Sequence, residues 1–312
     1  MTINVACIGA GNVGRAWAVV FARAGHRVAL YDRNTQMVET HAIPMIKASL
    51  ALLADGDTDA PIDEVLARVR IATTLEDALQ DVGYVQESVL EDIDIKRSIF
   101  EDLGRLTAAD CVLASSTSAI KGSEFLEDNP ARERALVAHP VNPPSLIPLV
   151  EVCPTPWTQA QTTTKATELL TSVGMQPIAL RKEIDGFVLN RLQYTLVAEA
   201  LHLVGEGYCT AADIDRVMTS GLALRWSFIG PFEVAHLNST GGFQGFVDQL
   251  GPMMRHMGKT ARTDYPWDDE MVAEIHEQLS EKTPVKDIPQ RQLWRDQQIL
   301  ATRKLHDDEE TQ

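Results

Sequence analysis

The sequence contains few cysteines, and none of them lies in a metal-binding or redox pattern. Its 312 residues include four cysteines that are far apart in the chain, with no Cys-x-x-Cys pair: Cys7, Cys111, Cys153 and Cys209. Cys7 and Cys111 fall inside apolar runs that are typical of buried strands. This spacing predicts reduced thiols in a reducing compartment, and we expect neither a disulfide framework nor a metal site.

Basic residues and long apolar runs are also scarce. The 28 lysine and arginine residues are outnumbered by 44 aspartate and glutamate residues, so the formal net charge is −16. Nucleic acid and anionic membranes are therefore disfavoured as partners, because the field of the protein repels phosphate. We find no apolar run long enough to cross a bilayer and no leader before the first apolar segment, so we expect a cytoplasmic protein.

The pattern of apolar residues divides the chain into two parts. Up to about residue 184, amphipathic segments alternate with seven short apolar runs, at residues 3–10, 26–32, 69–73, 83–88, 111–116, 135–140 and 149–152. Alternation of this kind predicts an α/β fold with a Rossmann-type, doubly wound and mostly parallel sheet. From about residue 185 the apolar spacing is helical. We therefore expect a sheet domain over residues 1–184 and an all-α C-terminal domain over residues 185–312.

A glycine pattern directly follows the first expected strand. In CIGAGNVGRAW, Gly9, Gly11 and Gly14 form a Gly-x-Gly-x-x-Gly motif at the start of a helix. These glycines allow the backbone to approach a pyrophosphate, whose charge the helix N-terminus stabilises. Asp32 ends the second expected strand, where a carboxylate binds ribose hydroxyls and repels a 2′-phosphate, although Arg33 would soften that preference. The alternative is a structural turn with a solvated aspartate; the agreement of strand, helix and acid favours NAD.

One histidine of the eight ends an expected strand of the sheet, and it is His139. Open α/β sheets bind ligands beyond the carboxyl ends of their strands. The following PVNPPS segment must turn, because proline cannot continue a strand ladder. If residues 149–152 return alongside, Glu151 reaches the imidazole and raises its basicity, so that the other ring nitrogen can take a proton from a substrate hydroxyl. The alternative is a core histidine bonded to a backbone carbonyl, with Glu151 solvated.

Several motifs together resemble the 3-hydroxyacyl-CoA dehydrogenase superfamily over nearly the whole chain. The general resemblance lies in AHPVNPP, LVEV and GFVLNRLQ, and SSTSAI, KEIDGFVLNRLQY and GLALRWSFIGPFE are most similar to its λ-crystallin and L-gulonate 3-dehydrogenase branch. The resemblance implies NAD-dependent oxidation of the 3-hydroxyl of a small hydroxy acid. It also implies that the helical domain contributes to substrate binding and forms a homodimer.

The same resemblance implies roles for individual residues around the reacting group. His139 would be the general base with Glu151 as its partner. Ser118, the last serine of SSTS, would hydrogen-bond the reacting oxygen, and Asn190 would position the substrate. The alternatives for these last two are a helix cap for Ser118 and an interhelical contact for Asn190.

Further matches concern the cofactor. Asn12 and Val13 match the backbone of the phosphate loop, and Glu91 and Lys96 match an acid and a lysine that contact the nicotinamide half of NAD in relatives. A solvated start of a helix is the alternative for Glu91 and Lys96.

Charge patterns bear on the substrate. The segment LLADGDTDAPIDE, in the region where relatives hold CoA, is acidic and disfavours a CoA thioester. A guanidinium can hold a free carboxylate through two parallel hydrogen bonds, each worth about 1.5–3 kcal/mol. We therefore expect Arg225 in GLALRWS to bind the carboxylate of L-gulonate or a similar 3-hydroxy acid. A structural or interface ion pair is the alternative for Arg225.

Rival functions remain at this point. Within enzymes they are dehydrogenases of 3-hydroxybutyrate, of its CoA ester or of carnitine, and the motifs HPVNPP and LNRL differ from the carnitine pattern. The rival from another class is an NAD-binding structural protein of the crystallin kind. The presence of His139, Glu151, Ser118 and Asn190 together favours an enzyme.

Overall fold

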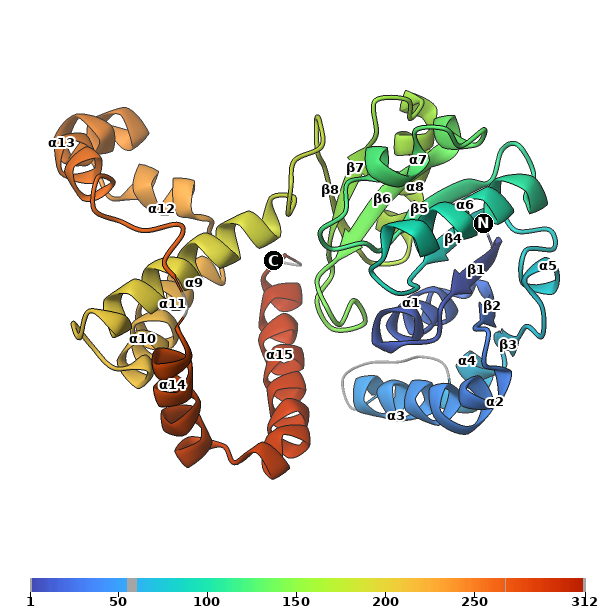
Figure 1. Ribbon diagram of the computed structural model, residues 1–312, viewed down its shortest axis with the longest axis horizontal. Coiled ribbons are helices and arrows are strands. Elements are labelled where there is room, and N and C mark those ends of the chain that lie inside the picture. The colour runs from blue at the N-terminus through green and yellow to red at the C-terminus, as the bar shows by residue number, and fades with distance from the viewer. Residues whose placement is uncertain (1, 55–60, 267, 311–312) are drawn as a thin grey trace. The chain divides into compact units, whose positions relative to one another are not determined.

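The computed structural model describes residues 2–54, 61–266 and 268–310, and it divides into two compact units (Figure 1). The first unit comprises Met1–Asn190 and Gln297–Lys304, and the second comprises Arg191–Asp296 and Leu305–Gln312. Residues 55–60, in the middle of the acidic segment, lie outside the described residues, as do the last two residues of the chain.

The first unit is built on one eight-stranded sheet with the order β3-β2-β1-β4-β5-β6-β7-β8. Neighbouring strands are parallel, except that β6 and β7 are antiparallel. The strand order reverses between β1 and β4, and ligands of open α/β sheets bind at the carboxyl ends of the strands beside such a reversal. The predicted doubly wound, mostly parallel sheet is confirmed. The strands are β1 (Asn4–Ile8), β2 (Arg27–Tyr31), β3 (Val69–Ile71), β4 (Tyr84–Glu87), β5 (Val112–Ser115), β6 (Ala135–Pro140), β7 (Leu149–Pro154) and β8 (Gln176–Ala179).

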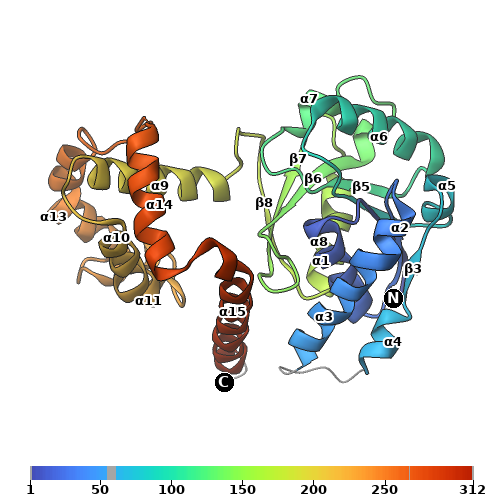
Figure 2. The ribbon, with the colours of Figure 1, turned by 60° about the horizontal axis from the view of Figure 1, so that its bottom comes forward.

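Helices cover both faces of this sheet (Figures 1 and 2). Successive side chains of a strand point to opposite faces, so Val5 and Cys7 pack in one core and Ala6 and Ile8 in the other. The first core also holds buried residues of α1, α3 and α8, and the second holds those of α5, α6 and α7. The helices are α1 (Asn12–Arg23), α2 (Thr35–Met37), η1 (Val38–Ala42), α3 (Ile43–Ala54), α4 (Ile62–Leu66), α5 (Leu75–Ala78), α6 (Ile93–Leu106), α7 (Gly122–Leu126), η2 (Arg132–Arg134) and α8 (Ala160–Ser172).

The continuous helical stretch Thr35–Ala54 is long and apolar enough, by length and composition, to cross a membrane. The expectation that no segment has this length was therefore wrong. Its buried residues recur every three or four positions and belong to the core on the α1 side of the sheet: Val38, Ala42, Ile46, Leu50 and Leu53. That spacing is the pattern of a helix that packs one face against a protein core.

The second unit is helical, and in the part of it that the structure describes there is no strand. It buries little of its own apolar surface, since no residue of α9 is buried and only Val234 and Ala235 are buried in α12. Large apolar side chains that are more than half exposed include Leu192, Tyr194, Tyr208, Leu224, Phe232 and Leu237. Its segments are α9 (Leu189–Gly205), α10 (Ala211–Val217), η3 (Met218–Leu222), α11 (Ala223–Trp226), α12 (Pro231–Leu237), α13 (Gly242–Met257), α14 (Asp269–Lys282), η4 (Val285–Asp287) and α15 (Ile288–Glu310).

The first unit also includes Gln297–Lys304, which are about two turns of α15. Ile299 and Leu300 pack against its core, and Arg303 donates a hydrogen bond of 2.9 Å to the carbonyl oxygen of Leu146. This contact supports the segment between β6 and β7, which carries the turn predicted at PVNPPS and includes a cis Asn142–Pro143 peptide bond.

Candidate active site

The turn between β1 and α1 has the backbone geometry that its glycines allow. Gly9 has a φ of +97°, and a Cβ atom there would collide with the carbonyl oxygen of Ser88. A Cβ atom at Gly14 would collide with the carbonyl oxygen of Gly9. At Gly11 a Cβ would meet no atom within 4 Å, so the space in front of the helix is open. The turn thus fits a pyrophosphate at the N-terminus of α1, where Asn12 and Val13 begin the helix.

Asp32 directly follows β2 and borders the same turn. One of its carboxylate oxygens accepts a hydrogen bond of 3.0 Å from the amide of Ala10, and the other accepts one of 3.1 Å from the amide of Asn34. With Gly9, Gly11 and Arg33, Asp32 lines a cavity of about 760 Å³. The cavity lies at the carboxyl ends of β1, β2 and β4, and its acidic edge suits the ribose hydroxyls of an adenosine group.

His139 and Glu151 face each other across the antiparallel pair of β6 and β7. The two residues are partners in the register, and His139 Nδ1 lies 2.7 Å from Glu151 Oε2. The imidazole is 5% exposed and the carboxylate is fully buried. The structure thus places together the two side chains that the turn after His139 was predicted to bring together.

The second oxygen of Glu151 is bound at the start of α9. Oε1 accepts hydrogen bonds of 2.8 Å from the amide of Val188 and 3.0 Å from the amide of Leu189. Burial raises the pKa of the Glu151 carboxyl, but the hydrogen bonds from His139 and from these two amides lower it by more, so the pKa lies below its usual value. An ionised Glu151 accepts the proton of Nδ1, which leaves Nε2 as the basic nitrogen of His139.

Phe187 supports this group of contacts, and sequence reasoning missed it. It is fully buried, packs with Val137 and Cys153, and its ring centre lies 5.4 Å from that of His139. Its φ is +51° and follows a φ of +71° at Gly186. A bulky residue in this region costs about 1–2 kcal/mol, which packing must offset. The glycine of the DGF sequence was the one available signal.

Ser118 and Asn190 are also in contact, but the contact is between the Asn190 side chain and the backbone of Ser118. Asn190 Nδ2 donates a hydrogen bond of 2.7 Å to the carbonyl oxygen of Ser118. The side chain of Ser118 is exposed, and its Oγ lies 3.4 Å from Glu91 Oε1. Asn190 therefore holds the segment that carries Ser118, whose exposed hydroxyl donates a long hydrogen bond to Glu91.

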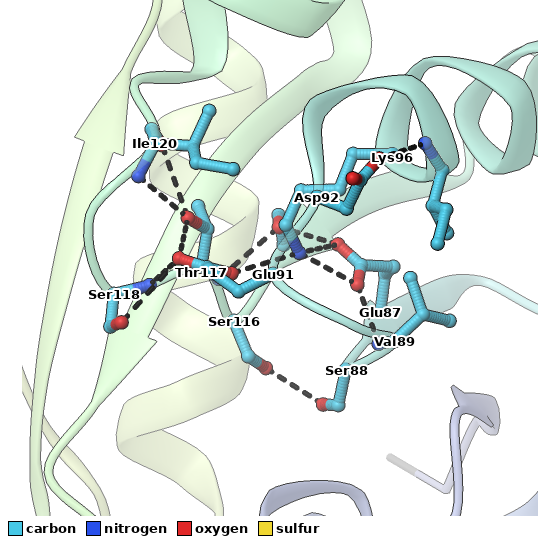
Figure 3. Close-up of polar contacts among 12 residues, drawn as sticks. Glu87, Ser88, Val89, Glu91, Asp92, Lys96, Ser116, Thr117, Ser118 and Ile120 are labelled. Atoms are coloured by element: carbon cyan, nitrogen blue, oxygen red, sulfur yellow. Dashed lines mark hydrogen bonds and ion pairs between the residues drawn. The ribbon is translucent and has the colours of Figure 1, made fainter.

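Glu91 organises the segment after β5 (Figure 3). Its Oε1 accepts hydrogen bonds of 2.6 Å from the Thr117 hydroxyl, 2.8 Å from the Ser118 amide and 3.0 Å from the Ala119 amide. Burial raises the pKa of Glu91, but the Thr117 hydroxyl, the Lys96 ammonium and the two amides lower it by more, so the net shift is downward. Glu91 is thus an ionised acceptor whose side chain is 38% exposed, and its predicted contact with the cofactor stays a prediction.

Lys96 is buried between two acids, and its predicted contact with the cofactor stays a prediction. Its side chain is 1% exposed, and its ammonium lies 3.0 Å from Glu87 Oε1 and 3.3 Å from Glu91 Oε2. The structure therefore places the ammonium between two carboxylates. Sequence reasoning did not single out Glu87, because an acid at the end of a strand gives no signal that it will be buried.

Arg225 lies in α11 of the second unit, where its side chain is exposed. Its proposed contact with a substrate carboxylate stays a prediction.

Two models of one protein family match the chain, one in its N-terminal part and one in its C-terminal part. The model of the 3-hydroxyacyl-CoA dehydrogenase NAD-binding domain matches residues 4–184, and that of the C-terminal domain of the same family matches residues 186–285. Lambda-crystallin of Oryctolagus cuniculus is 36% identical over 97% of this chain and 96% of its own length. L-carnitine dehydrogenase of Nocardiopsis dassonvillei is 32% identical over 98% of this chain and 92% of its own length.

Two solved structures extend the comparison. One is an NAD+-dependent 5-dehydrogenase of 5-formyl-3-hydroxy-2-methylpyridine-4-carboxylic acid. The match covers 98% of this chain and 98% of that chain, with a TM-score of 0.82 and 25% identity. The match to the 3-hydroxybutyryl-CoA dehydrogenase of Escherichia coli covers 75% of this chain and 49% of the chain of that enzyme, with a TM-score of 0.65 and 28% identity.

Proposed function

Because the chain belongs to the 3-hydroxyacyl-CoA dehydrogenase family and is an NAD-dependent dehydrogenase, we propose that it oxidises the 3-hydroxyl group of a small free hydroxy acid. L-Gulonate, oxidised to 3-dehydro-L-gulonate, is the substrate we favour. The observation that carries the proposal is the 2.7 Å contact between His139 and Glu151 at the carboxyl end of β6.

The chemistry follows from the protonation states at this contact. Glu151 holds the proton on Nδ1 of His139, so Nε2 accepts the proton of the substrate hydroxyl. The glycine turn and Asp32 would hold NAD, which would supply the acceptor for the hydride on the carbon that bears this hydroxyl. The Ser118 hydroxyl and the new imidazolium donate hydrogen bonds to the oxygen as it becomes a carbonyl. The product is a 3-keto acid.

A free acid is favoured over a CoA thioester by charge. The segment LLADGDTDAPIDE is acidic and would repel the phosphates of CoA. Arg225 supplies a guanidinium that can bind a carboxylate with two hydrogen bonds. The named substrate of the pyridine-carboxylic acid dehydrogenase also carries a free carboxylate, which agrees with this preference.

The substrate is tested by measuring NADH formation with L-gulonate, 3-hydroxybutyrate, 3-hydroxybutyryl-CoA and carnitine. We expect the highest kcat/KM with L-gulonate or another free 3-hydroxy acid. Turnover restricted to the CoA ester or to carnitine would overturn the free-acid proposal and support the functions named for the other relatives.

Arg225→Ala should raise KM for the free acid by about tenfold, as the loss of one charge-assisted bond implies. An unchanged KM would show that Arg225 does not bind the substrate.

We also propose that two copies of the chain associate through the helical unit. Large apolar side chains are exposed on α9, α11 and α12, among them Leu192, Leu224 and Phe232, and a second copy could cover them with the same surface of its own. Sedimentation equilibrium should give the mass of two chains. Phe232→Glu should shift the mass toward one chain, whereas Met45→Glu, an exposed apolar position of α3, should not. A single-chain mass for the unaltered protein would contradict the proposal.

A further inference from the structure

A buried carboxylate at the end of β4 has no part in the chemistry described so far. Glu87 is fully buried, and its partner Lys96 in α6 is 1% exposed. The Lys96 ammonium lies 3.0 Å from Glu87 Oε1 and 3.2 Å from Oε2. Two further donors bind the same carboxylate, namely the Ser115 hydroxyl at 2.5 Å and the Val89 amide at 2.7 Å.

Stability alone is a poor explanation for such a pair. Removing a carboxylate and an ammonium from water is costly, and a well-packed apolar pair of similar volume stabilises a fold as well or better. Both oxygens of the Glu87 carboxylate nevertheless accept hydrogen bonds, and the two bonds from Lys96 hold its ammonium inside the first unit. The hydrogen bonds to Glu87 thus give the Lys96 ammonium a defined position.

Two paths lead from Glu87 to the segment that carries Ser118, and Figure 3 labels Lys96, Glu91 and Ser118 of the first. In the first, Lys96 binds Glu87 and also Glu91 Oε2 at 3.3 Å, while Glu91 Oε1 accepts the amides of Ser118 and Ala119. In the second, Ser115 donates to Glu87 and its Oγ accepts a hydrogen bond of 3.2 Å from the Thr117 amide. Both paths meet at residues 117–119.

We propose that Glu87 is a positioning residue that sets the place of the Ser118 hydroxyl through Lys96, Glu91 and Ser115. The inference rests on the proposed function in one respect, namely that Ser118 binds the reacting oxygen. Glu87 itself touches neither cofactor nor substrate. Its negative charge keeps the Lys96 ammonium between two acids, and without it the ammonium has Glu91 alone as its carboxylate partner and draws Glu91 away from the amides.

The test is a double-mutant cycle between Glu87 and Ser118. Glu87→Gln keeps the shape and the acceptor oxygen but removes the charge, and it should lower kcat by about 10- to 100-fold, the range expected when a reacting group is displaced by about 1 Å. In a Ser118→Ala background, Glu87→Gln should have little further effect on kcat.

A matched control separates positioning from general destabilisation. Asn129 is buried in the same unit, and its Oδ1 accepts a hydrogen bond from the Ala131 amide. Asn129→Ala should lower the urea midpoint without lowering kcat. If Glu87→Gln does not fold, Ser115→Ala breaks the second path alone and should give a smaller loss of kcat that also vanishes in the Ser118→Ala background.

The outcomes are distinct. Equal losses of kcat with and without the Ser118 hydroxyl, or an unchanged kcat in Glu87→Gln, would overturn the inference. The proposed function fails by a different result, which is that the unaltered chain turns over no free 3-hydroxy acid. In that case the cycle is run with whichever hydroxy substrate the unaltered chain oxidises.

Discussion

His139 and Leu189 bind the two oxygens of one buried carboxylate, His139 through Nδ1 at 2.7 Å and Leu189 through its backbone amide at 3.0 Å. Leu189 is the first residue of α9, and the N-terminus of a helix stabilises negative charge. Glu151 therefore stays ionised while it holds the imidazole. The carboxylate joins the end of β6 to the first residue of α9, so one side chain binds both the imidazole and the N-terminus of that helix.

The lowered pKa of Glu151 predicts a specific loss of stability in acid. A carboxyl whose pKa is lower in the folded than in the unfolded state stabilises the fold above the unfolded value, about 4.3 for glutamate, and this contribution is lost as pH falls through the folded pKa. The free energy of unfolding, measured in urea from pH 6 to pH 3, should therefore fall more for the unaltered chain than for Glu151→Gln. Glu168→Gln, at an exposed position of α8, is the control. Parallel curves for the unaltered chain and Glu151→Gln would be evidence against the shift.

Asp32 should determine the choice between NAD and NADP. Asp32→Asn keeps the acceptor for the Ala10 amide but removes the charge that repels a 2′-phosphate, and Arg33 lines the same cavity. The ratio of kcat/KM for NADP to that for NAD should rise by about tenfold, the effect of one charge-assisted contact. Asp94→Asn, which removes another carboxylate from the lining of this cavity, should leave the ratio nearly unchanged. Equal ratios in both variants would mean that Asp32 does not face the ribose.

Phe187 should affect both stability and turnover. Its ring packs beside the His139 imidazole, and the next two amides bind Glu151. Phe187→Leu should lower the free energy of unfolding by about 1 kcal/mol and should also lower kcat. Phe100→Leu, at a fully buried position of α6, should cost a similar amount of stability with kcat unchanged. If the two variants keep the same kcat, the ring of Phe187 has no role beyond packing.

The sequence predicted seven of the eight strands of the described sheet and missed the one that is most exposed. The seven apolar runs correspond to β1–β7, and the missed strand, β8, lies at the edge of the sheet, is largely exposed and contains Pro177. Its four residues carry no apolar alternation, because only β7 and one face of α8 lie beside it. Edge strands of this kind form through tertiary pairing rather than through their own pattern.

In the site, too, features that depend on neighbouring residues in the sequence could be predicted, and features that depend on tertiary contacts could not. The turn after His139 could be predicted from prolines, which act locally, and it brings Glu151 opposite the imidazole. The burial of Lys96 could not be predicted, because a lysine in an amphipathic helix usually faces solvent and its two acids come from other segments of the chain. The positive φ of Phe187 was hidden for a similar reason, since packing against Val137 and Cys153 stabilises it.

The central claim is that Glu151 makes His139 a base, and the most direct test is kcat of Glu151→Gln. The variant keeps an acceptor for the two amides but loses the charge that fixes the proton on Nδ1. Glu183→Gln, which alters a carboxylate bound to the Ser123 amide, is the control and should retain kcat. We predict that Glu151→Gln lowers kcat by about 10²- to 10⁴-fold with little change in the dissociation constant for NAD. A kcat within about twofold of the unaltered chain would contradict the account, since a general base contributes far more than this.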